Sequence, residues 1–234
     1  MLELQSQFHQ DVLGLSYKYQ GVKNLMPVTI NGNGSITGLS VGGLGSGVVN
    51  TASIADGAVT NVKHGTGSVI QVQTGSFTGT NNITLGSAAT FYELDDFNVT
   101  ITSTVANSKF LVSCNFSGEP NFDDYELGIR IQRTIGGSVS PIFVGATAGS
   151  RTSVLGMSNQ GYHNSDTNST IASNSFSNLL DTPNQSAGTA IKYAVYIAHL
   201  NGSSNYALNR TWGNSDSRTH ERAFSTMTVM EVAP

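Results

Sequence analysis

Acidic side chains gather in one short part of the chain, and they are the first residues whose spacing could support chemistry. Loop carboxylates there could converge on Ca²⁺, which takes six to eight oxygen ligands. They could also form the carboxylate pair of a glycosidase, or be solvated turn residues that keep sheet edges soluble. We favour the solvated turns, with a Ca²⁺ site near Asp95/Asp96 or Asp123/Asp124 as the alternative. Seven of the fifteen acidic residues belong to this stretch: Glu93, Asp95, Asp96, Glu119, Asp123, Asp124 and Glu126.

The remaining reactive residue types form no recognisable catalytic pattern. The five histidines make no H-x-x-x-H pair, and the single cysteine excludes both a thiolate zinc site and a disulfide within the chain. That cysteine, Cys114, stands among alternating apolar residues in "FLVSCNF", which predicts a buried free thiol. A Ser-His-Asp triad stays open, because such residues meet only in the fold, but no nucleophile elbow marks one. We therefore predict no enzyme activity, no cofactor and no metal.

Two polar segments combine aromatic and amide side chains, which suits carbohydrate or protein recognition. Ring faces stack on C–H groups, and amides pair with hydroxyls. The only tryptophan, Trp212, lies in a polar stretch, where it could form an exposed rim or plug the core beneath the loop. We predict receptor-binding residues in both segments: Tyr162, His163, Asn164 and Asp166 in the first, and Tyr206, Arg210, Trp212 and Asp216 in the second.

The composition indicates the type of scaffold that must position these loops. Charged residues make up 11% of the 234 residues, the net charge is −4, and Gly, Ser, Thr and Asn are abundant. This mixture favours turns and solvent-facing strands over helices. Lys and Arg are scattered singly, which argues against nucleic-acid binding, and no apolar run has membrane-spanning length. The first residues, "MLELQSQFHQ", do not resemble a secretory signal.

From Val69 onward, apolar and polar residues alternate as they do in half-buried β-strands. Residues 67–234 are therefore predicted to form an antiparallel β-sandwich of jelly-roll type, an all-β fold. The last strand is apolar on both faces, so we expect it to lie centrally in a sheet or against a neighbouring subunit. The main predicted strands are "VIQVQT", in which Ile70 and Val72 alternate with glutamines, "FNVTIT", "FLVSCNF", "ELGIRIQR", "IKYAVYIAH" and "AFSTMTVMEVA", and shorter candidates are 83–85, 142–146, 153–157 and 206–210.

Residues 27–66 are rich in glycine, with small apolar residues between the glycines. One such strand buries too little apolar surface to offset about 1–2 kcal/mol of backbone entropy per residue. Three strands wound about an axis could share a core, so we predict an intertwined trimeric stalk. A Gly/Ser linker is the alternative. The predicted stalk core consists of Ile36, Leu39, Val41, Leu44, Val49, Ile54 and Val59.

Residues 1–26 differ in composition from the rest of the chain. They contain clustered tyrosines and lysines, and glycines that would break a long helix. The segment is too short to form a domain. We interpret it as an attachment arm that orders against another protein, and an unstructured tail is the alternative.

Several motifs, taken in order, resemble the fibre proteins of bacteriophage virions. "SIADGAVTNVKHGTGSVIQVQ" resembles the collar that leads into the head domain of such fibres. "FNVTITSTVANSKFLVSCNFSG", "GIRIQRTIGGSVSPIFVGATAGSR", "LLDTPNQSAGTAIKYAVYIAHLNG" and the closing "STMTVMEV" continue the resemblance over residues 47–234. The resemblance implies a homotrimer that is attached to the virion through its N-terminal part. It also implies a C-terminal head that meets the host surface.

These observations lead to one expected function and two alternatives. We expect a virion protein on the tail or capsid surface whose residues 1–26 contact other virion proteins and whose head binds a host glycan or envelope receptor. Threefold display would strengthen weak single sites. A structural virion protein without a receptor, such as a capsid decoration or a tail or baseplate component, is the main alternative. A glycan-cleaving tailspike is a weaker one.

Overall fold

The computed structural model describes residues 29–30, 36–37, 54–121, 126–158 and 170–234. It divides into two units, Met1–Ala58 and Val59–Pro234, which we treat separately. We call the second unit the head. The predicted boundary between stalk and head lay at residue 66, whereas residues 59–66 group with the head. One contact that holds this segment is the hydrogen bond from Asn61 Nδ2 to Thr104 Oγ1, at 3.0 Å.

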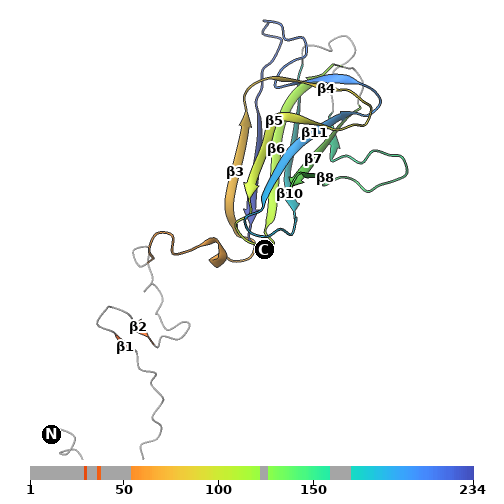
Figure 1. Ribbon diagram of the computed structural model, residues 1–234. Helices are drawn as coiled ribbons and strands as arrows, with labels where there is room; N and C mark the ends of the chain where they lie inside the picture. Colours follow the sequence, from red (N-terminus) through yellow and green to blue (C-terminus); the bar gives the residue numbers. More distant parts are fainter. Residues whose placement is uncertain (1–28, 31–35, 38–53, 122–125, 159–169) are drawn as a thin grey trace, which may run out of the picture. The chain divides into compact units, whose positions relative to one another are not determined.

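Eleven strands of the head form two antiparallel sheets (Figure 1). The first, which we call sheet I, contains β3 (Val69–Phe77), β4 (Asn81–Leu85), β6 (Lys109–Pro120), β10 (Ala172–Asp181), β12 (Ser204–Leu208) and β13 (Ser225–Val232). The second, sheet II, contains β5 (Tyr92–Thr102), β7 (Leu127–Ile135), β8 (Ser138–Ile142), β9 (Gly156–Met157) and β11 (Ala190–His199).

Three pairs of these strands are halves of longer interrupted strands. Gly118 of β6 pairs with β10 on one side and with β12 on the other, and Asn115 does the same with β10 and β13. Strands β12 and β13 therefore lie end to end along one edge of β6. By the same reasoning β3 continues into β4 beside them, and β8 and β9 share the edge of β7 that faces away from β11.

With these pairs joined, the head has eight long strands, and their order identifies the topology. Numbered along the chain, sheet I has the order 1-8-3-6 and sheet II has the order 2-7-4-5. This is the arrangement of a jelly roll, in which two Greek keys form a two-layer sandwich. The prediction of an all-β jelly-roll head is confirmed. In the described part of the chain the one helical element is a short turn, η2 (Asn61–Lys63), and no helix is long and apolar enough to cross a bilayer.

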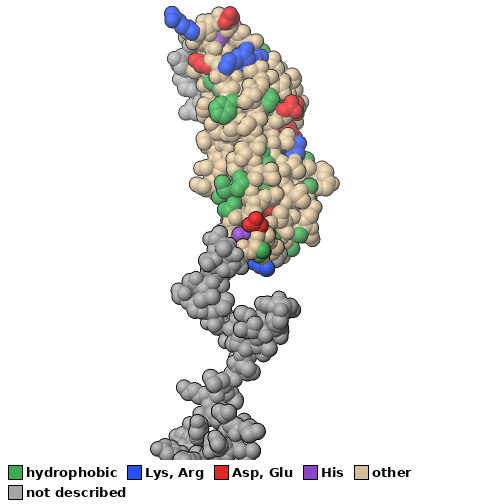
Figure 2. Space-filling model, turned by 90° about the vertical axis from the view of Figure 1, so that its left-hand side faces the viewer, with side chains coloured by type: hydrophobic (Ala, Val, Ile, Leu, Met, Phe, Trp, Pro, Cys, Tyr) green, Lys and Arg blue, Asp and Glu red, His purple; other side chains and the backbone are tan. Residues whose placement is uncertain are grey.

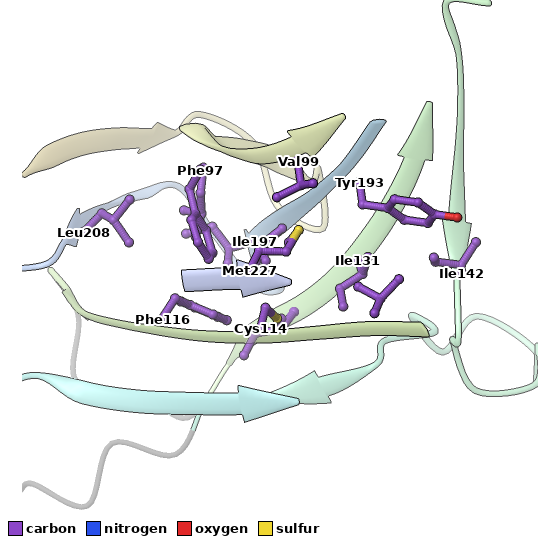
Figure 3. Packing of buried hydrophobic residues seen from close by; sticks show 14 of the residues in the cluster. Phe97, Val99, Cys114, Phe116, Ile131, Ile142, Tyr193, Ile197, Leu208 and Met227 are labelled. Carbon is purple, nitrogen blue, oxygen red and sulfur yellow. The ribbon is translucent and has the colours of Figure 1, made fainter. Parts of the chain in front are cut away.

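The core lies between the two sheets, as Figure 3 shows for part of it. Phe97, Val99, Tyr193, Ile197 and Ile131 project from sheet II toward Cys114, Phe116, Leu208 and Met227 of sheet I. All are buried. The rings of Phe97 and Phe116 lie 6.3 Å apart in a tilted arrangement, which is favourable for aromatic pairs. The alternation that predicted half-buried strands in "FNVTIT", "FLVSCNF", "ELGIRIQR" and "IKYAVYIAH" is therefore confirmed, since β5, β6, β7 and β11 each bury their apolar face.

The first strand of the head, β3, corrects a prediction. Around residues 71 and 72 its polar side chain faces the interior and its apolar side chain faces solvent, the reverse of the half-buried strand predicted for "VIQVQT". The apolar side chain of Val72 is 51% exposed, whereas Gln71 points toward the buried Glu231. The reason is the close approach of β3 to sheet II. A Cβ added at Gly75 would lie 2.9 Å from the carbonyl oxygen of Asn98, so bulky apolar side chains have no room on the inward face there.

Antiparallel topology sorts the connections onto two ends of the sandwich. The start of β3 and the end of β13 meet at the proximal end, where Gly67 N donates to Ala233 O and Ala233 N to Ser68 O. The C-terminus lies at this end in Figure 1. At the opposite, distal end β4, β6, β9 and β11 end and β5, β7, β10 and β12 begin.

The N-terminal unit contributes one described element, the pair β1 (Thr29–Ile30) and β2 (Ile36–Thr37), which are antiparallel. Ile36 belongs to β2. Two other predicted stalk residues, Ile54 and Val59, are described, and they are 44% and 53% exposed in the single chain. The attachment arm, residues 1–26, and the stalk residues Leu39, Val41, Leu44 and Val49 lie outside the described residues, so the stalk and the arm stay predictions.

Candidate binding surface at the distal end

A single asparagine closes the base of the long loop between β12 and β13. Asn209 adopts the left-handed backbone conformation, with φ of 59°, which asparagine tolerates better than most residues. Its side-chain amide donates to the carbonyls of Phe77 and Gly79 at 2.7 and 3.0 Å, and its side-chain oxygen accepts from Ser225. Ala223 N donates to Asn209 O, so the chain leaves the strand at 209 and returns at 223.

Arg210 follows directly, and its guanidinium holds the first turn of this loop. Nη1 donates to the carbonyls of Thr211 and Trp212 at 2.7 and 3.0 Å, and Nη2 donates to Asn82 Oδ1 on the neighbouring β4. Burial, and second the positive charge of Arg222, lower the pKa of Arg210. Since the guanidinium is committed to these acceptors, Arg210 positions the loop rather than offering its hydrogen bonds to a ligand.

Trp212 is fixed by its backbone while its ring stays half-buried. Trp212 N donates to Glu119 Oε2 at 2.7 Å, and Glu119 is itself buried at the end of β6. The guanidinium carbon of Arg210 lies 5.9 Å from the centre of the indole ring, within cation–π range. Trp212 is therefore half-buried beside Arg210, between the exposed rim and the buried plug that the sequence left open.

The rest of the loop forms an exposed crest, residues 213–222. Arg222 Nη2 donates to Asn214 Oδ1 at 2.7 Å, and Ser217 and Thr219 share a hydroxyl hydrogen bond. In Figure 1 the crest is dark blue and lies at the end opposite the C-terminus. Figure 2 shows basic and acidic side chains gathered at this end of the head. An aromatic ring, amides and both signs of charge are therefore presented together.

The predicted binding residues differ in their exposure to solvent. Asp216 is exposed on the crest and Trp212 lies at its base. Tyr206 is fully buried, so it cannot contact a receptor, because alternation along β12 directs it into the core. Arg210 is also buried and serves the loop. Tyr162, His163, Asn164 and Asp166 lie outside the described residues.

The acidic stretch does not form a cation site within the described residues. There, no group of three or more His, Cys, Asp or Glu side chains is placed to hold a metal ion. Asp95 and Asp96 are exposed where β5 pairs irregularly with β11. Glu93 is engaged with Lys192 Nζ at 2.6 Å and with Tyr196 Oη at 2.8 Å. Asp123 and Asp124 lie outside the described residues.

Three residues organise the loop base: Asn82, Glu119 and Asn209. The sequence marked Glu119 only as one of the clustered acidic residues, and it assigned none of the three to this loop. Each acts through contacts to residues far away along the chain, so no local spacing marks it. Asn209 alone carried a weak signal, because an asparagine that follows a strand often ends it in a left-handed conformation.

The chain matches no protein-family model and no curated protein sequence. Among solved structures it is similar to a chain of infectious bursal disease virus, Gx strain (13% identity, TM-score 0.34), over 70% of this chain and 41% of that one. It is also similar to the VP2 subviral particle of the same virus (12%, 0.33, 70% and 42%) and to FLHE (10%, 0.25, 70% and 98%). The chain thus spans about two fifths of the viral proteins that it matches. TM-scores this far below 0.5 establish no shared function.

Proposed function

We propose that this chain is a homotrimeric fibre protein of a bacteriophage virion. Residues 1–26 attach it to other virion proteins, and the head binds a host surface glycan or envelope receptor through its distal end. The observation that carries the proposal is the separation of the two ends of the head. The chain enters and ends at the proximal end, while Trp212 and the exposed crest project at the distal end.

This polarity suits a fibre head because the end joined to the preceding chain points toward the particle and the loops point away. The ordered resemblance of residues 47–234 to phage fibres gives independent support. Recognition by Trp212 would be weak in a single copy, and threefold display would strengthen it by roughly 10² to 10⁴. The protein would act without a metal, a cofactor or a catalytic step.

A structural virion protein without a receptor is the second candidate. It is favoured by the burial of Tyr206 and Arg210, which removes two of the predicted contact residues from the distal surface. On this alternative the residues of the loop base only hold the loop closed between β12 and β13, and they do not support a binding surface.

Binding of the purified, fluorescently labelled chain to bacterial cells and to isolated surface polysaccharides tests the proposal. We expect saturable binding that falls about tenfold or more in Trp212→Ala, because stacking is lost from every copy. The exposed Val139 on β8 provides the matched control, and Val139→Ala should bind like the parent chain. Absence of binding to any cell or polysaccharide, with firm attachment to virions, would favour the structural role. Release of oligosaccharides would indicate a tailspike.

A further inference from the structure

The outward face of sheet I carries a line of apolar side chains that crosses all four of its long strands. Val72 of β3 pairs with Met230 of β13, Met230 with Leu111 of β6, and Leu111 with Leu180 of β10. We call these four residues the apolar row. Val72 and Leu180, at its two ends, are 51% and 49% exposed, and the two central residues are half-buried.

The row belongs to a face with very little charge. In the next set of paired outward residues toward the proximal end, Val232 pairs with Val69 on one side and with Lys109 on the other. On the other side the outward positions are hydroxyl and amide residues, such as Thr74, Thr228 and Ser113, and the first two share a hydroxyl hydrogen bond at 3.2 Å. Among the outward residues that pair β3 with β13 and β13 with β6, Lys109 is the one charged side chain. Two such faces can meet without burying like charges.

The inverted polarity of β3 makes this face a built feature rather than a scatter of exposed residues. Gln71 points inward, where its amide nitrogen lies 3.1 Å from Glu231 Oε2 and 3.1 Å from Thr102 O in the orientation that satisfies both acceptors. Val72 consequently points outward. Figure 2, which views the head from the β3 side, shows hydrophobic side chains gathered on its lower part.

Sheet II has no such row across its strands. Its exposed large apolar residues, Val139 and Met157, stand singly on the edge strands β8 and β9, and outward residues of its other strands are engaged within the chain. Glu93 is engaged with Lys192 and Tyr196. The guanidinium of Arg130 lies 3.8 Å from the centre of the Phe91 ring and donates to Ser153 O. Leu200 and Val154 pack over Gly128. A row of apolar side chains that crosses neighbouring strands is therefore a feature of sheet I.

We propose that the apolar row is covered by further copies of this chain, so that the heads pack on one another through the outward faces of sheet I. The inference rests on the proposed trimer and names the surface that holds its heads together. The row lies toward the proximal end, close to the start of β3, where Gly67 and Ser68 bond to Ala233. A stalk that gathers three chains would bring this end of each head together first, and a neutral apolar face suits an identical partner.

Cysteine labelling tests the proposal, because the folded parent chain has almost no thiol that a reagent can reach. The single native cysteine, Cys114, is buried. Val72→Cys and Leu180→Cys place a thiol at the two ends of the row, and Val139→Cys on sheet II is a matched control, since Val139 is 48% exposed in a single copy. The full chain is treated with a maleimide dye, and its mass is measured by light scattering. Labelling in denaturant confirms that each thiol is competent.

We expect an oligomeric mass and labelling at residues 72 and 180 that is roughly tenfold or more slower than at residue 139. Loss of the oligomer in the two row variants, with the control unchanged, would also support the proposal. Equal rates at all three sites in an oligomer would overturn this interface and leave the trimer standing. A mass of one copy would overturn both the interface and the trimer. Slow labelling at residues 72 and 180 in such a monomer would mean that the chain's own N-terminal part covers the apolar row.

Discussion

Asp181 links the two sheets at the level of single residues. It lies at the end of β10 in sheet I, where its carboxylate accepts from Arg133 Nη1 at 2.7 and 2.8 Å and from Tyr193 Oη at 2.8 Å. Both donors belong to sheet II. Burial, and second the negative charge of Asp181, raise the pKa of Tyr193 well above its ordinary value, so the phenol remains a donor.

Replacing Asp181 with Ala should destabilise the head by about 3 kcal/mol, because the half-buried Arg133 would lose its counter-charge and the buried hydroxyl of Tyr193 its acceptor. Urea unfolding monitored by fluorescence measures the change. Lys192→Met is the matched comparison, since Lys192 pairs with Glu93 at 2.6 Å on the outward face of sheet II. That loss should cost about 1 kcal/mol or less. Equal costs for the two variants would contradict the assigned importance of the inter-sheet pair.

Alkaline pH should weaken the fold through Cys114. Burial raises the pKa of its thiol from 9.0 to about 12. Above about pH 9 the unfolded chain loses the thiol proton while the folded chain keeps it, so the free energy of unfolding falls as the pH rises from 9 toward 12. Chemical denaturation across this range measures the slope, and Cys114→Val should show a smaller one. Rapid reaction of the folded parent with a disulfide reagent at pH 8 would refute the burial.

At the scale of elements, alternation predicted the strands whose two faces differ in polarity. Strands β5, β6, β7 and β11 each place apolar residues on one face, and each was found. Strand β10, with the sequence "ASNSFSNLLD", was missed because a register shift between Phe176 and Leu179 breaks its period. The inward direction of Gln71 was also unpredictable, since it depends on the distance between two sheets that no local pattern records.

The closest approach of two strands gives a prediction of its own. A Cβ at Gly118 of β6 would lie 2.3 Å from Ala207 O and 2.5 Å from Tyr206 Oη, in the fully packed interior. Gly118→Ala should therefore cost about 3 kcal/mol or prevent folding, because the crowding involves backbone. Gly145→Ala is the control, since its nearest atom would lie 4.0 Å away. Comparable thermal midpoints for both variants would contradict this packing.

For the whole molecule, the candidate site was harder to predict than the fold. Aromatic residues in polar surroundings indicated Trp212 and Tyr206 equally, but one lies half-buried at a loop base and the other in the core. Their difference arises from which residues of "NYALNRTW" are paired with β4, a long-range contact. Ile54 and Val59 of the predicted stalk core are 44% and 53% exposed in the single chain, and the stalk stays a prediction.

If folding and association are coupled as proposed, the thermal midpoint should rise with protein concentration. Mass action favours the folded oligomer over unfolded single chains, so each tenfold increase in concentration should move the midpoint upward by a measurable amount. Calorimetry over a wide concentration range gives the dependence. A midpoint that stays constant would show that the head unfolds as an independent monomer.

Deleting residues 1–26 separates attachment from assembly. We expect the shortened chain to keep the oligomeric mass and the cooperative unfolding of the parent, because the head and the predicted stalk are retained. It should fail to enter virions, because the attachment arm is lost. Light scattering and immunoblotting of purified particles measure the two properties. Normal incorporation of the truncated chain would remove the arm from the proposed function.

Because the loop base is closed at Asn209, the length of the crest does not affect the arrangement of the strands in the sandwich. Because Ala223 N bonds to Asn209 O, the two feet of the excursion stand side by side whatever lies between them. We expect that the intervening residues 213–222 can be exchanged for other peptides while both sheets keep their register. If the crest binds a receptor as proposed, the same closure lets sequence variation alter specificity, and it gives protein engineers a graft point for displayed sequences.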